Sequence, residues 1–97
     1  MYTIQNSIKN QAFNKLQVHK LAQNETIEIL SISLEKGALF PTHTSPKDAQ
    51  LIVIEGDIVF HIEGGEYRLE TQQHFSFPKA TEHWVSANEN TKFLIVR

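Results

Sequence analysis

The sequence predicts an all-β fold, built as one domain over residues 1–97, and three features of the chain carry this prediction. Apolar residues recur with a period of two along most of the chain, as in strands that bury one face. The apolar runs are short, and turn residues separate them roughly every eight to twelve residues. This pattern is typical of a two-sheet sandwich or barrel.

The expected strands follow one another with few interruptions. The apolar pattern marks them at 27–34, 51–54, 58–62, 67–69, 75–77, 84–86 and 93–96. Gly64 and Gly65 form the expected two-residue turn between the strands at 58–62 and 67–69. The stretch 8–21 matches a helical repeat only loosely, so we expect strand or loop there.

Composition and charge exclude several classes of function. Nine basic residues are scattered singly among eleven acidic ones, and the formal net charge is -2, so the chain lacks the basic patch of a nucleic-acid-binding protein. It has no cysteine, which excludes disulfides, zinc fingers and thiol nucleophiles. No apolar run is long enough to cross a membrane, and the polar start is unlike a signal peptide. We therefore expect a cytoplasmic protein.

Two segments carry more information than the strand pattern. The first spans about 37–56 and contains Gly37, His43 and Gly56, and the second spans about 72–88 and contains Pro78 and His83. These residues resemble the two signature motifs of the cupin superfamily. The resemblance implies a double-stranded β-helix, the jelly-roll barrel of cupins, which closes around a pocket. It also implies a homodimer that pairs sheet edges, and exposed edge strands are a physical reason for such pairing.

The departures from the cupin pattern concern its metal site. The family holds a metal with two His and one Glu from the first motif and one His from the second. Here Ser45 and Ala49 occupy the positions of the second His and the Glu, so only His43 and His83 carry over as metal ligands. Two glycines and a final asparagine of the motifs are replaced by Gln72, Ala80 and Ala87.

Two imidazoles make a poor site for a divalent metal such as Fe, Mn, Ni or Zn, which normally has three or more protein ligands. The nearest residues that could complete the set are Asp48 and Gln50. Gln50 would point away from the barrel if Ala49 keeps the direction of the family's Glu, because neighbours on a strand face opposite ways. We therefore expect a degraded or absent metal site.

The preferred function is the binding of a small polar metabolite inside the barrel. His43 and His83 would be the polar anchors, and Phe40 and Trp84, beside the ends of loops, would form walls. One alternative is a metal-dependent enzyme of the oxygenase or isomerase type, with a third ligand such as Asp48. Another is an interaction module that binds a second protein and leaves the pocket empty.

The remaining aromatic and histidine residues are assigned by their phase in the strands. Phe75 and Phe77 alternate and are expected in the core. His61 and His74 are out of phase with the apolar residues around them, so we expect both to face solvent or an interface.

Overall fold

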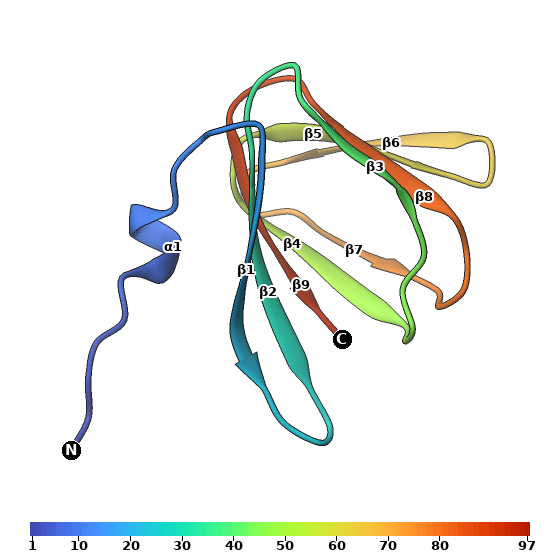
Figure 1. Cartoon of the computed structure of the whole chain (residues 1–97). Coiled ribbons are helices and arrows are strands. Elements are labelled where there is room, and N and C mark those ends of the chain that lie inside the picture. The colour runs from blue at the N-terminus through green and yellow to red at the C-terminus, as the bar shows by residue number, and fades with distance from the viewer.

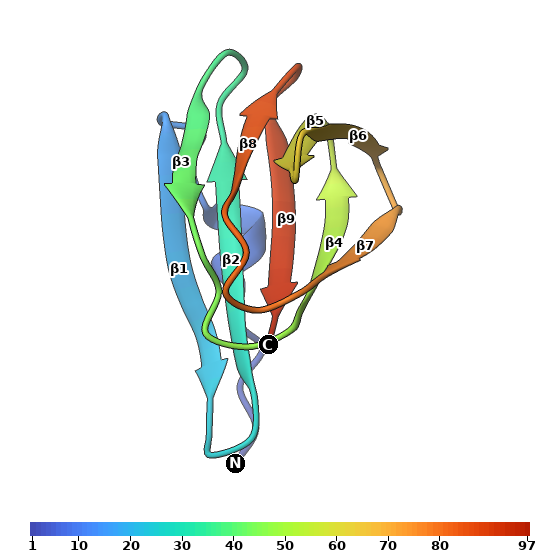
Figure 2. The same ribbon diagram turned by 90° about the vertical axis from the view of Figure 1, so that its right-hand side faces the viewer.

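Two antiparallel sheets pack face to face in the computed structural model, which describes residues 1–97 (Figure 1). The five-stranded sheet has the order β1 (Leu16–Gln23), β2 (Glu28–Leu34), β9 (Thr91–Val96), β4 (Ala49–Glu55) and β7 (His74–Phe77). The four-stranded sheet has the order β3 (Leu39–His43), β8 (His83–Ala87), β5 (Asp57–Ile62) and β6 (Gly65–Glu70). Figure 2 shows the chain crossing between the two layers. The all-β prediction is confirmed. The structure adds β3 to the expected strands, and β1 occupies the end of the stretch where strand or loop was expected.

The core lies between the sheets and is filled by residues that alternate along their strands. In β9, for example, Phe93 and Ile95 point inward while Leu94 and Val96 are only partly buried on the other face. Phe77 is buried in the core and Phe75 packs against it, as predicted. The buried apolar side chains are those of Ile32, Leu34, Ala49, Leu51, Val53, Ile58, Phe60, Leu69, Phe77, Val85, Ala87, Phe93 and Ile95.

The N-terminal segment differs from the prediction at one point. Residues Ser7–Asn10 form a single helical turn, α1, rather than strand or loop, whereas β1 begins at Leu16 as a strand. The ammonium group of Lys92, on the outer face of β9, donates hydrogen bonds to the carbonyls of Ile8 (2.8 Å) and Lys9 (3.1 Å). Because these contacts come from the far end of the chain, no local pattern predicts the turn. No helix in the structure is long and apolar enough to span a membrane.

The β5–β6 hairpin is shifted by one residue from the expected turn. Its two central residues are Glu63 (φ 50°) and Gly64 (φ 75°), and Gly65 already pairs with Ile62 as the first residue of β6. Positive φ at both central positions is the signature of a type I′ turn. Glu63 therefore occupies a left-handed position that the sequence suggested for glycine.

One end of the barrel is closed by the turn that joins β4 to β5. Gly56 has φ +122°, and a Cβ added there would lie 2.6 Å from the backbone Cα of Thr91. Only glycine meets both conditions. Thr91 accepts a hydrogen bond from the backbone of Asp57 at 3.0 Å, so the turn is joined directly to the start of β9.

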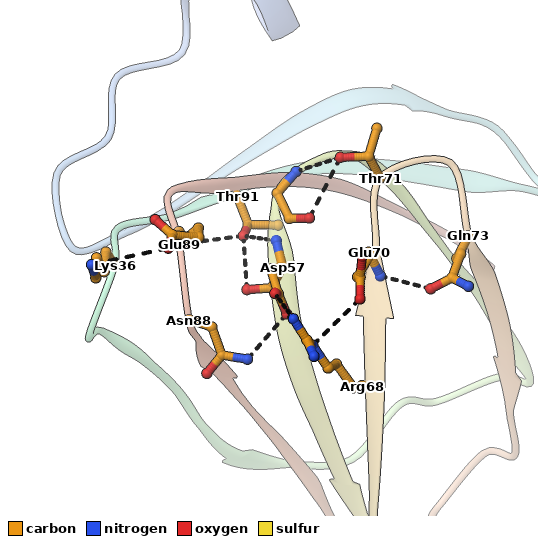
Figure 3. Close-up of polar contacts among 10 residues, drawn as sticks. Lys36, Asp57, Arg68, Glu70, Thr71, Gln73, Asn88, Glu89 and Thr91 are labelled. Atoms are coloured by element: carbon orange, nitrogen blue, oxygen red, sulfur yellow. Dashed lines mark hydrogen bonds and ion pairs between the residues drawn. The ribbon is translucent and has the colours of Figure 1, made fainter.

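Asp57 is the centre of a polar network at this closed end (Figure 3). Arg68 donates to its carboxylate from Nε (3.1 Å) and Nη2 (2.6 Å), and Asn88 donates from Nδ2 (3.0 Å). The hydrogen bonds from Arg68, and then from Asn88, hold the pKa of Asp57 below its ordinary value. Thr91 begins β9 here and Arg97 follows its last residue, so the network and Arg97 lie at opposite ends of the barrel.

Two residues with positive φ stand where the cupin motifs have glycine. Gln72 has φ 68° and Ala80 has φ 58°. A left-handed conformation brings a Cβ close to the following carbonyl oxygen and costs roughly 1–2 kcal/mol per residue. The chain therefore keeps the backbone of the motifs at these two positions without the residue that adopts it most easily.

Candidate functional site

A β-bulge in β3 brings Phe40 and His43 to the same side of the sheet. Phe40 pairs with Val85 of β8, and the next paired residue is His43, opposite His83. Between these two pairs β3 has two residues where β8 has only one, Trp84, and this is the arrangement of a β-bulge. Residues three apart on a regular strand would face opposite ways, but here the rings of Phe40 and His43 stack with centroids 4.2 Å apart.

His83 is the most deeply placed histidine of the chain. It is 2% exposed and its ring packs against Phe60 (centroids 5.1 Å apart) and Phe77 (4.7 Å). It starts β8 and faces inward with Val85, two residues further on. The sequence prediction that His43 and His83 share one environment holds geometrically, because they are direct partners across the β3–β8 pair.

The two imidazoles meet through their Nε2 atoms, which lie 3.0 Å apart. The Nδ1 of His43 lies 2.7 Å from the carbonyl oxygen of Pro41, and that of His83 lies 2.9 Å from the carbonyl oxygen of Thr81. A carbonyl oxygen can only accept, so each Nδ1 carries the hydrogen and donates it. In the neutral pair both Nε2 atoms are therefore hydrogen-bond acceptors, facing one another without a donor between them.

Burial lowers the pKa of His83, and this is the largest influence on the ring. The hydrogen bond to the carbonyl of Thr81 acts in the opposite direction, while the nearby charges of His43 and Arg97 lower the pKa further. His83 is thus held neutral in the free protein, and an additional positive charge at the pair is opposed by Arg97.

The histidine pair lies at the inner end of a cavity of about 260 Å³. Its apolar wall is formed by Val18, Leu30, Ile32, Phe40, Pro46, Phe77 and Ile95, and its polar groups belong to His43, Thr44, Ser45, His83 and Arg97. Val18 is 50% exposed although it lies opposite Ile32 on the inner side of the sheet, so part of its surface faces this cavity. An apolar chamber with a few convergent polar groups is the usual form of a small-molecule site.

Arg97 is a site residue that the sequence prediction missed. Its backbone continues the ladder between β9 and β2, with hydrogen bonds to Glu28 in both directions. Its side chain follows the inward phase of Phe93 and Ile95, and that alternation is the signal that could have found it. The guanidinium donates from Nε to Glu28 at 2.8 Å, and the hydrogen bond holds the pKa of Glu28 below its ordinary value.

The residues considered as a third metal ligand are not brought to the histidines. Asp48 accepts a hydrogen bond from the backbone of Lys79 at 2.9 Å, and Gln50 donates to Ser76 at 2.6 Å. Both line a separate hollow beside β7. Ala49 is buried and Gln50 exposed, as expected from the strand alternation. No three His, Cys, Asp or Glu side chains gather where they could hold a metal ion.

Ser45 stands where the family has its second histidine, and its hydroxyl is used within its own turn. It donates to the carbonyl of Lys47 at 2.6 Å. The Nη1 of Arg97 lies 3.5 Å from the same oxygen. The guanidinium cation of Arg97 therefore lies beside the position where the family has its second histidine ligand. This end of the cavity already carries a positive side chain, unlike a site that binds a metal cation.

Trp84 lies outside this cavity, on the outer face of the four-stranded sheet. It follows the inward-facing His83, so it points the other way, and its ring stacks on His61 with centroids 3.5 Å apart. The expectation that Trp84 forms a wall with Phe40 does not match this placement. His61 is off the core face as predicted, yet Trp84 covers it and only 14% of its side chain is exposed. His74 is exposed on the outer face of β7.

The sequence also matches a known protein family. The family model described as a cupin domain matches residues 30–97, which is most of the chain. The chain belongs to the cupin family. This confirms the family suggested by the two motifs. No curated protein matches the sequence.

Solved structures of other cupins have the same fold. An RmlC-like cupin from Desulfovibrio desulfuricans is similar with a TM-score of 0.86 and 20% identity, over 99% of this chain and 95% of that one. A conserved protein of unknown function from Streptococcus pyogenes, SPY1581, has a TM-score of 0.85 and 23% identity, over 99% and 86%. KdgF from Halomonas sp. has a TM-score of 0.75 and 22% identity, over 84% and 76%. At these identities the similarity concerns the fold alone.

Proposed function

We propose that this cupin binds a small polar metabolite in its barrel, with the His43–His83 pair as the polar anchor and without a resident metal ion. The observation that carries the proposal is the contact between the two Nε2 atoms at 3.0 Å. Each Nδ1 is committed to a backbone carbonyl, so two lone pairs face one another at the end of a cavity. A ligand that supplies a proton or a hydrogen-bond donor removes this conflict.

Two facing lone pairs would also attract a divalent metal, but the remaining groups do not fit one. Structural and catalytic metal sites normally use three or more protein ligands, and here only His43 and His83 offer suitable atoms. Ser45 and Ala49 replace the other two ligands of the family. Arg97 adds a positive charge to the same cavity, which opposes a cation further. The alternative of a metal-dependent oxygenase or isomerase therefore has less support.

We also propose that two copies associate, through the outer face of the five-stranded sheet rather than through the sheet edges that the cupin resemblance implied. A sheet face in contact with water usually carries polar residues. Here it carries five aliphatic side chains, which come from three neighbouring strands: Ile29, Ile52, Ile54, Leu94 and Val96. Ile54 is 38% exposed. Light scattering should report a dimer for the wild type and a monomer for Ile54→Lys, and an Ile54→Lys dimer would contradict this proposal.

The binding function is tested by two measurements on protein purified without chelator or a histidine tag. Elemental analysis should find no metal near one equivalent. A thermal-shift screen of polar metabolites should find a ligand whose stabilisation is lost in His43→Ala but kept in His74→Ala, the matched control on the outer face. Metal near one equivalent that falls in His43→Ala would support the enzyme instead. The proposal would be contradicted if no metabolite stabilises the protein. It would also be contradicted if the stabilisation is the same in His43→Ala as in the wild type.

A further inference from the structure

We infer that the ligand is a small carboxylic acid, whose carboxylate pairs with Arg97 in the cavity beside the His43–His83 pair. The inference rests on the proposed function and names the chemical class of the ligand. It follows from two features of the cavity: a guanidinium with free donors and an apolar chamber of limited size.

Arg97 supplies the group that recognises the carboxylate. Its Nε is taken by Glu28 at 2.8 Å, and Nη1 lies 3.5 Å from Ser45, a long contact. A guanidinium has five N–H donors, so most of the hydrogens on Nη1 and Nη2 remain for a ligand. Their planar arrangement matches the two oxygens of a carboxylate. The Arg97 side chain is 21% exposed, so the ion pair would be partly shielded from water.

Arg97 is the only Lys, Arg, Asp or Glu residue among those that line the cavity. Glu28 is the one carboxylate paired with it. A ligand in the cavity therefore meets one fixed positive charge, and that charge favours an anionic group.

The apolar wall limits the rest of the ligand. Leu30, Ile32, Phe40, Phe77 and Ile95 surround the space beyond the polar groups. The volume of about 260 Å³ lies just under the range of roughly 300–1,000 Å³ that is usual for drug-sized ligands. A short aliphatic or single-ring acid is therefore the expected class.

The test compares acids with their uncharged amides. Isothermal titration of the full-length protein with butyrate and butyramide, and with benzoate and benzamide, should show the acids binding about tenfold or more tightly, because the amides lack the charge-assisted pair. Arg97→Gln should lose about tenfold or more in affinity for butyrate, whereas Glu28→Gln, which breaks the same ion pair but leaves Arg97, should not.

Each contrary result has a distinct meaning. The carboxylate inference would be overturned if the amides bind as well as the acids, or if no acid of the series binds. Equal losses in Arg97→Gln and Glu28→Gln would also overturn it. If a neutral polar metabolite still binds through His43, the proposed binding function stands without this inference. If no small molecule of either kind depends on His43, both fail.

Discussion

The backbone N–H of Ala80 donates a hydrogen bond to the carbonyl of Ser45 at 2.9 Å. This contact joins the β3–β4 and β7–β8 loops at the mouth of the barrel, close to the C-terminus in Figures 1 and 2. It also joins two positions where the chain departs from the cupin motifs, since Ser45 replaces a histidine and Ala80 a glycine. The two loops are therefore joined through their backbones at positions where the side chains differ from the motifs.

Restoring glycine at the strained positions should stabilise the protein. Ala80→Gly and Gln72→Gly relieve a left-handed conformation that costs roughly 1–2 kcal/mol, against an entropic cost of glycine of roughly 0.5–1 kcal/mol. We expect each to raise the free energy of unfolding by about 0.5–1 kcal/mol in urea denaturation. Ala22→Gly, at a strand residue without positive φ, is the control and should lower it. A loss of stability in both variants would refute the strain argument.

Gly56 should be the least replaceable glycine of the chain. Gly56→Ala combines a positive φ with a Cβ 2.6 Å from the backbone of Thr91, so we expect a loss of about 3 kcal/mol or more, or failure to fold. Gly37→Ala is the matched control, because its φ is +83° but no atom lies within 4 Å of the added Cβ. Equal losses in the two variants, by thermal or chemical denaturation, would show that the clash has no effect.

The stability of the free protein should depend on pH through His83. Its pKa is lowered in the folded state, so the unfolded state binds more protons as pH falls past the ordinary His value of about 6.5. The stabilising contribution of neutral His83 is present above that value and is lost as pH falls toward the folded pKa. Between pH 7 and 5, the free energy of unfolding should fall more in wild type than in His83→Gln.

The carboxylates with lowered pKa values do not interfere in this window. The contributions of Glu28 and Asp57 are lost only as pH falls below about 4.5, the ordinary range for carboxyl groups. His74→Gln, on the outer face, is the control and should keep the wild-type slope. If His83→Gln and wild type have parallel pH profiles, burial does not govern the protonation of His83.

Much of the fold could be predicted from the sequence because each strand buries one face. Period-two alternation located the core residues, and the motif spacing brought His43 and His83 to one site. The same alternation, applied at two further positions, would have placed Trp84 outside the barrel and Arg97 inside it. The helical turn α1 could not be predicted, because Lys92, far away in sequence, holds it in place.

The arrangement of side chains inside the site was harder to predict than the positions of its two histidines in the sequence. The bulge that turns Phe40 and His43 to the same side depends on pairing with β8. Its one sign in the sequence of β3 is Pro41, since a proline inside a strand is confined to edge strands and bulges. The direction of each imidazole depends on the backbone carbonyls of Pro41 and Thr81, which a sequence cannot place. These carbonyls decide that both Nε2 atoms are acceptors, and so determine what the site can bind.

The most direct test of the central claim is long-range ¹H–¹⁵N NMR of the histidine rings in the free protein. His43 and His83 should both carry hydrogen on Nδ1 and none on Nε2, so that two acceptor atoms face one another at 3.0 Å. An Nε2-protonated tautomer of either ring would contradict the account.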